Sequence, residues 1–213
     1  TTSIDLYAEA DGYTRSTTTT VRVVEKNNKN ITLSSAQEQN MIGEAAQYLM
    51  SQTDTSQSVT EWIAIGLAAA GQDTSAITEA VVSYDPKITD DYAMSEIARH
   101  ILAMEALGQD TSVYVTRLGK ADDAAAFVND NIFAGLALLA SGVPADDDDV
   151  QAAITAAKQA INTDGGISYA INETVSDVDT TAYFVQLLTA AGANGKIKQT
   201  AVRYLRDQQN LDC

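Results

Sequence analysis

Residues 62–75 read Trp-Ile-Ala-Ile-Gly-Leu-Ala-Ala-Ala-Gly-Gln-Asp-Thr-Ser, and residues 101–112 read Ile-Leu-Ala-Met-Glu-Ala-Leu-Gly-Gln-Asp-Thr-Ser. Two further copies of the apolar part, Phe-Ala-Gly-Leu-Ala-Leu-Leu-Ala-Ser-Gly and Phe-Val-Gln-Leu-Leu-Thr-Ala-Ala-Gly, occupy residues 133–142 and 184–192. Each copy closes on a glycine, the residue that most often follows the end of a helix. The four closing glycines are 37, 34 and 50 residues apart. A repeat of this length predicts helical hairpins that stack side by side.

The sequence around these copies has helical periodicity from Ser34 onward. Apolar side chains recur four positions apart, for example at Met41, Ala45 and Leu49. Each unit combines a long helix, a glycine stop and a short helix whose start carries Asp, Ser or Thr. We therefore predict an all-α domain of helical-hairpin repeats over residues 34–213. Besides a first helix that starts at Ser34 or Ser35, helices are expected near residues 59–70, 75–84, 90–107, 130–141, 147–161, 178–191 and 196–208.

Residues 1–33 have a different pattern. Ile4 and Leu6 alternate with polar residues, and Thr17–Val24 is rich in β-branched side chains, which favours strands. Asn27–Asn30 has the composition of a linker. We predict that residues 1–33 form a short β segment, either a hairpin or the remnant of an upstream β-sandwich, followed by this linker. Because the chain starts at Thr1 without a Met or a signal peptide, we expect it to be a piece of a longer protein.

The composition excludes several classes of partner and site. A net charge of −16 opposes binding to nucleic acid and to anionic membrane surfaces. No apolar run approaches the roughly 20 residues that a transmembrane helix needs, so no membrane insertion is expected. The only histidine is His100 and the only cysteine is Cys213, which is too few for a zinc site built from these residues. We expect no metal and no cofactor.

Two motifs in the last third of the chain point to a family. Asp164–Tyr169 reads Asp-Gly-Gly-Ile-Ser-Tyr, and Ser176–Ala182 reads Ser-Asp-Val-Asp-Thr-Thr-Ala. Together with the repeated apolar helices, these motifs resemble the prenyltransferase/squalene-oxidase repeat of the terpenoid cyclase/protein prenyltransferase superfamily over about residues 36–210. The resemblance implies an α/α toroid, in which an inner ring of parallel helices lies within an outer ring. The sequence has fewer helices than a full toroid, so the ring is either incomplete or continued outside this stretch.

Asp179 is the one candidate catalytic residue. Residues 177–182 are similar to the Asp-x-Asp-Asp-Thr-Ala motif of squalene–hopene cyclases, in which the middle aspartate, matching Asp179, protonates an alkene. The third aspartate of that motif is Thr180 here, and aromatic residues, which stabilise carbocations in such enzymes, are only 6% of the chain. The alternative is that Asp177 or Asp179 caps the next helix. We expect the Asp179 carboxylate to accept hydrogen bonds from backbone N–H groups near Thr181.

The missing catalytic groups favour a non-catalytic toroid domain that binds a protein, a glycan or a small molecule. The acidic composition and the β-rich start favour a larger extracellular or surface protein. The alternatives are a terpenoid-cyclase-like enzyme that uses Asp179 as general acid, and a structural spacer. A molecule bound in the mouth of the ring would favour the first function, an enclosed aromatic cavity at Asp179 the second, and a filled ring the third. The residues expected to contact a ligand are Trp62, Tyr169, Asp177, Asp179 and Tyr183.

Overall fold

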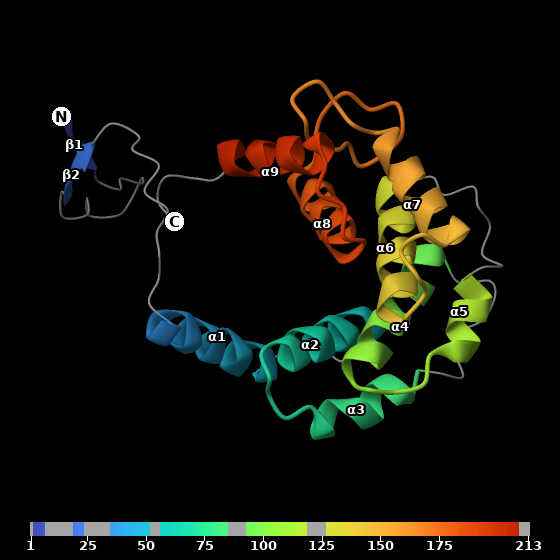
Figure 1. Cartoon of the computed structure of the whole chain (residues 1–213). Coiled ribbons are helices and arrows are strands. Elements are labelled where there is room, and N and C mark those ends of the chain that lie inside the picture. Colours follow the sequence, from blue (N-terminus) through green and yellow to red (C-terminus); the bar gives the residue numbers. More distant parts are fainter. Residues whose placement is uncertain are drawn as a thin grey trace. The chain divides into compact units, whose positions relative to one another are not determined.

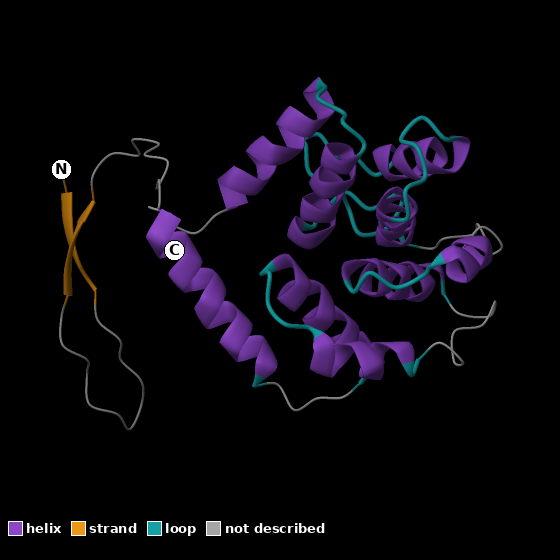
Figure 2. Cartoon of the chain, turned by 60° about the horizontal axis from the view of Figure 1, so that its bottom comes forward, coloured by secondary structure: helices purple, strands orange, loops and turns teal. Residues whose placement is uncertain are grey.

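The chain divides into two compact units, Thr1–Met41 and Ile42–Cys213. The computed structural model describes residues 2–6, 19–23, 35–51, 56–84, 93–118 and 127–208. In the first unit, strands β1 (Thr2–Leu6) and β2 (Thr19–Val23) pair antiparallel, with Ile4 opposite Val21 (Figure 2, orange). The predicted linker at Asn27–Asn30 lies outside the described residues.

The described part of the chain after residue 34 is helical and contains no strand, which confirms the all-α prediction (Figure 2). One short helix, α5, was absent from the predicted ranges, because seven residues hold too little of the 3.6-residue period to be recognised. No helix within the described ranges combines the length and the apolar character needed to cross a membrane. The helices are α1 (Ser35–Met50), α2 (Gln57–Ala69), α3 (Ser75–Val82), α4 (Met94–Ala106), α5 (Ser112–Leu118), α6 (Val128–Ala140), α7 (Asp148–Lys158), α8 (Val178–Ala190) and α9 (Lys196–Gln208).

The helices of the second unit pack in two rows (Figure 1). Helices α2, α4, α6 and α8 each contact the next one, and we call them the even row. Helices α3, α5, α7 and α9 each pack on the helix that precedes them in the chain. Each repeat therefore supplies one even-row helix and one short or amphipathic helix behind it.

The four even-row helices end in the same way. Each is followed by a glycine with positive φ, at Gly71, Gly108, Gly142 and Gly192. At the first of these ends, the Gly71 N–H donates to the carbonyl of Ala68 and the next N–H donates to the carbonyl of Leu67. The other three ends repeat both hydrogen bonds, which define the Schellman motif. A Cβ on any of these glycines would meet nothing within 4 Å, so the backbone conformation alone requires glycine.

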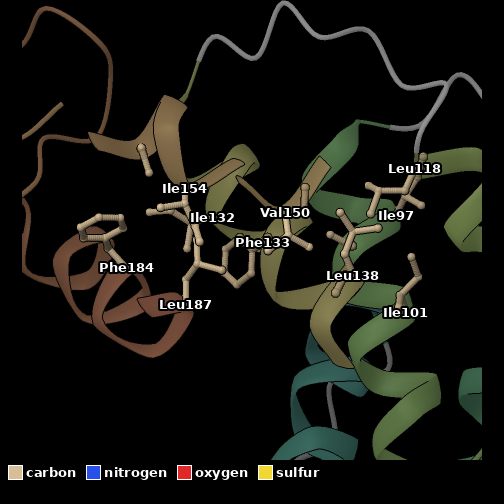
Figure 3. Close-up of a cluster of buried hydrophobic side chains, with 14 of the residues drawn as sticks. Ile97, Ile101, Leu118, Ile132, Phe133, Leu138, Val150, Ile154, Phe184 and Leu187 are labelled. Atoms are coloured by element: carbon tan, nitrogen blue, oxygen red, sulfur yellow. The ribbon is translucent and has the colours of Figure 1, made fainter. Parts of the chain in front are cut away.

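The core lies between the even row and the helices behind it. Figure 3 shows a cluster of its buried apolar side chains, among them residues of α4 (Ile97, Ile101), α5 (Leu118), α6 (Ile132, Leu138), α7 (Val150, Ile154) and α8 (Phe184, Leu187). Helices α6, α7 and α8 approach closely at Gly135, where a Cβ would lie 2.9 Å from a Leu187 methyl carbon and 3.1 Å from the Ala153 Cβ. This packing fixes the relative positions of the N-terminal ends of the even-row helices, where the candidate site lies.

Candidate functional site

A pocket of about 340 Å³ lies at the N-terminal ends of the even-row helices. All four even-row helices contribute to it, and so does the loop between α7 and α8. The structure places all five predicted ligand-contacting residues on its wall, together with five residues that were not predicted. The lining residues are Trp62, Ser95, Arg99, Asn129, Phe133, Tyr169, Asp177, Asp179, Thr180 and Tyr183.

Four lining residues occupy the same position in successive repeats. Trp62, Arg99, Phe133 and Tyr183 are each the sixth residue of a 13-residue helix. Because equivalent helices stack side by side, equivalent side chains meet in one place. The sequence contains this signal, since each of the four residues lies nine positions before the glycine that closes its repeat. Counting back from the glycines would have identified Arg99 and Phe133, which reasoning from motifs missed.

Three of these sixth-position residues form an aromatic cluster. Trp62 stacks with Tyr183 at 6.4 Å between ring centroids, and both rings lie tilted against Phe133, at 5.7 and 4.8 Å. Phe133 is buried and continues into the core (Figure 3), whereas Trp62 is 39% exposed. The cluster therefore has a fixed inner part and a ring whose surface is accessible from the pocket.

The fourth sixth-position residue, Arg99, is held from behind by a buried carboxylate. Its Nε donates to Glu61 Oε2 at 2.6 Å, and the other oxygen of Glu61 contacts His100 Nδ1 at 2.8 Å. Gln57 also donates to that second oxygen. Glu61 and His100 are fully buried, and the Arg99 side chain is 15% exposed. In the part of the chain that the structure describes, the terminal N–H groups of Arg99 have no hydrogen-bond partner, so they remain available at the pocket.

Tyr169 reaches the pocket from an anchored loop. Its carbonyl accepts a hydrogen bond from the Val128 N–H at the start of α6, and its ring lies 4.8 Å from that of Phe127. Earlier in the loop, the Ile167 N–H donates to Thr181 Oγ1 in α8 at 2.9 Å, and the Ile167 carbonyl accepts from the Asp177 N–H at 2.8 Å. The loop is therefore tied to two even-row helices, and the Tyr169 ring, 42% exposed, is held beside their N-terminal ends.

The two glycines of the Asp-Gly-Gly-Ile motif allow this loop to pack. The backbone of Gly165 has φ +89°, and a Cβ there would overlap the Thr200 side chain and lie 3.1 Å from the Thr200 carbonyl oxygen. A Cβ on Gly166 would lie 2.5 Å from the Ser176 Cβ. Asp164 completes the turn, because its Oδ1 accepts from the Gly166 N–H and from the Ser176 hydroxyl.

Of the two aspartates predicted as the cap of α8, Asp177 is the cap, and the expectation that Asp179 accepts the capping hydrogen bonds is wrong. Asp177 has the extended backbone of an N-cap residue, and its Oδ1 accepts from the Thr180 N–H at 2.6 Å. Asp179 is already the second residue of the helix and is exposed. It contributes a charge to the first turn, where a carboxylate interacts favourably with the helix dipole.

The polar groups of the pocket suit binding by hydrogen bonds. Asn129 Oδ1 is buried and lacks a partner among the described residues, and buried polar atoms are normally paired. Within those residues, no group of three or more His, Cys, Asp or Glu side chains could hold a metal ion. Comparison of this chain with known protein families, with curated proteins and with solved structures gave no match.

Proposed function

We propose that residues 34–213 are a non-catalytic α/α toroid domain of a larger extracellular or surface protein, and that the pocket at the N-terminal ends of the even row binds its ligand. The observation that carries the proposal is the convergence of Trp62, Arg99, Phe133 and Tyr183, one residue from each of four repeats. The two rows of helices and the Asp-Gly-Gly-Ile motif support the toroid. The acidic composition supports the extracellular setting.

Unsatisfied polar groups favour a binding site over a structural spacer. The terminal N–H groups of Arg99 and the Oδ1 atom of Asn129 have no partners among the described residues. Leaving a buried polar atom unpaired costs about 1–3 kcal/mol. This cost applies to Asn129 Oδ1, whereas the Arg99 N–H groups are not among the buried unpaired atoms of the described residues. A domain that only separates its neighbours gains nothing from such a cost.

A cyclase-like enzyme is the second candidate, because Asp179 and the aromatic rings line the same pocket. Two features oppose it. The Arg99 guanidinium and the Asn129 amide line that pocket too, whereas a cyclase surrounds its carbocation with aromatic rings. Asp177, the neighbouring carboxylate of the motif, is occupied in capping α8.

Trp62 is the only tryptophan of the chain, so tryptophan fluorescence reports on the pocket directly. We expect at least one compound from a panel of neutral sugars, amines, carboxylates and short peptides to change this fluorescence saturably. Tyr183→Ala, which removes one wall, should weaken that binding at least tenfold. The control Tyr48→Ala, a substitution of a tyrosine that is 66% exposed on α1, should leave it unchanged.

The same protein tests the alternatives. A polyprene such as squalene should be recovered unchanged after incubation with the parent chain, as judged by mass spectrometry. A cyclised product that disappears with Asp179→Asn would establish the enzyme instead. If no member of the panel changes the Trp62 fluorescence, the spacer is the better description.

A further inference from the structure

The charges of the pocket oppose a ligand that is simply anionic or cationic. Arg99 presents its guanidinium to the pocket, and the buried Glu61 balances part of that charge from behind. Asp177 is occupied by the Thr180 N–H, and Asp179 remains as an exposed carboxylate at the rim. An anion attracted by Arg99 would also meet the two aspartates, and a cation attracted by Asp179 would meet the guanidinium. A neutral polar ligand avoids both repulsions.

The hydrogen-bonding groups of the pocket are of both kinds. Arg99 offers donors, the Asp179 carboxylate offers acceptors, and the Asn129 side-chain amide carries both kinds of group. Ser95 lines the same wall with a hydroxyl, which can do either. A ligand that pairs with all of them must donate and accept within a small volume. Hydroxyl groups do this, since each donates one hydrogen bond and accepts two.

The aromatic residues add an apolar surface next to these polar groups. Trp62 is 39% exposed and Tyr169 is 42% exposed, and both line the pocket. The face of an aromatic ring carries partial negative charge, so it attracts C–H groups made positive by neighbouring oxygens. A volume of about 340 Å³ is at the small end of ligand pockets, which range over roughly 300–1,000 Å³.

From these three features we infer that the ligand is a neutral carbohydrate, with one sugar ring in the pocket. A pyranose has a C–H face for Trp62 and Tyr169 and a rim of hydroxyls for Arg99, Asn129 and Asp179. This inference rests on the proposed function and names the ligand class of that same pocket. The small volume assigns the pocket to a single ring, either a free monosaccharide or the end of a glycan.

The test is a titration of the whole chain with glucose, galactose, mannose and N-acetylglucosamine, each up to tens of millimolar, followed by Trp62 fluorescence. We expect saturable binding of at least one sugar. Asn129→Leu removes the amide at similar volume and should weaken binding about tenfold without lowering the melting temperature. Tyr169→Ala should weaken it to a similar extent.

A matched pair of carboxylates checks the location. Asp179→Asn should weaken sugar binding, whereas Asp149→Asn should not, because Asp149 is the second residue of α7 and is not among the residues that line the pocket. If Asn129→Leu, Tyr169→Ala and Asp179→Asn bound the sugar as tightly as Asp149→Asn, the sugar would bind outside this pocket and the inference would be overturned.

The remaining outcomes separate the inference from the proposed function. If no sugar binds but acetate, methylammonium or a peptide changes the Trp62 fluorescence, the inference of a carbohydrate ligand is wrong and the proposed ligand-binding function stands. If neither sugars nor the other compounds bind, both are wrong.

Discussion

The two ends of the even-row helices follow different rules. At the C-terminal ends, four glycines with positive φ make the same pair of hydrogen bonds. At the N-terminal ends, the cap residues are Ser56, Ala93, Phe127 and Asp177, and only Asp177 caps its helix with a side-chain hydrogen bond. The uniform ends fix where each repeat stops, and the varied ends carry the pocket. Because the C-terminal ends alone define where each repeated helix stops, the residues at the N-terminal ends are free to differ and to form a pocket.

The largest effect is expected from the buried carboxylate behind the pocket. Glu61→Ala leaves Arg99 and His100 without their shared partner in a region that is almost closed to water. Breaking a buried ion pair by removing one member costs about 3–5 kcal/mol. We expect a loss of this size in the free energy of unfolding, measured by urea denaturation.

The control is Glu79→Ala, which changes an exposed glutamate of α3 and should alter stability by less than about 0.5 kcal/mol. Equal stability of Glu61→Ala and Glu79→Ala would mean that the buried carboxylate behind the pocket contributes no more to stability than an exposed glutamate. The comparison between the two ends of the helices would then fail.

Two glycines with nearly the same φ distinguish the cost of backbone strain from the cost of steric overlap in a glycine-to-alanine substitution. Gly165→Ala, in the loop that precedes α8, combines a positive φ with overlap against Thr200 and should cost about 2–5 kcal/mol. Gly142→Ala, at a C-terminal stop, has φ +84° but open surroundings, so only the backbone term of about 1–2 kcal/mol applies. Thermal unfolding followed by circular dichroism measures both, and a larger loss for Gly142→Ala would contradict this account.

A smaller effect separates the two aspartates at the start of α8. Asp177→Ala removes the cap and should cost about 0.5–2 kcal/mol, whereas Asp177→Asn keeps a capping oxygen and should cost much less. At Asp179, Ala and Asn should have equal effects of about 0.3–1 kcal/mol, because only the charge near the helix dipole is lost. Urea denaturation of the four variants would reject the assignment of the cap if Asn and Ala were equal at Asp177 and unequal at Asp179.

The smallest effect concerns the turns that follow the first two glycine stops. The hydroxyl and the N–H of Ser75 lower the pKa of Asp73, and the N–H and the hydroxyl of Ser112 lower the pKa of Asp110. A lowered pKa in the folded state gives stability that is complete above the ordinary pKa of about 4 and is lost as the pH falls through the lowered value. As the pH is lowered below 5, the melting temperature of the parent should therefore fall slightly more than that of the double variant Asp73→Asn/Asp110→Asn. Parallel curves for the two proteins would show that these turns do not contribute.

The sequence predicted those features of the fold that repeat. The closing glycines identified four even-row helices, although the predicted 59–70 and 90–107 differ from Gln57–Ala69 and Met94–Ala106 by up to four residues at their starts. The starts of these helices were predicted less accurately, because three of the four cap residues make no side-chain cap hydrogen bond. Glycine stops are uniform, so they were found.

The site could be predicted only in part. Its aromatic and acidic residues stood in or beside recognisable motifs, whereas Asn129 carries no motif. The burial of Glu61 could not be foreseen, because glutamate is almost never fully buried unless paired and its partner Arg99 lies 38 residues away. Either Asp177 or Asp179 could have capped the helix on sequence grounds, and the start of α8 at Val178 makes Asp177 the cap.

The fixed distance between the sixth position of each even-row helix and its glycine has a consequence for how such a pocket can change over time. A substitution at that position, such as one at Phe133, replaces one wall and leaves the helix and its stop as they were. An insertion between Phe133 and Gly142 would instead rotate the wall residue by about 100° around the helix axis and remove it from the pocket. Single exchanges at these positions would therefore alter the proposed binding pocket one wall at a time, while insertions and deletions in these helices would disrupt it.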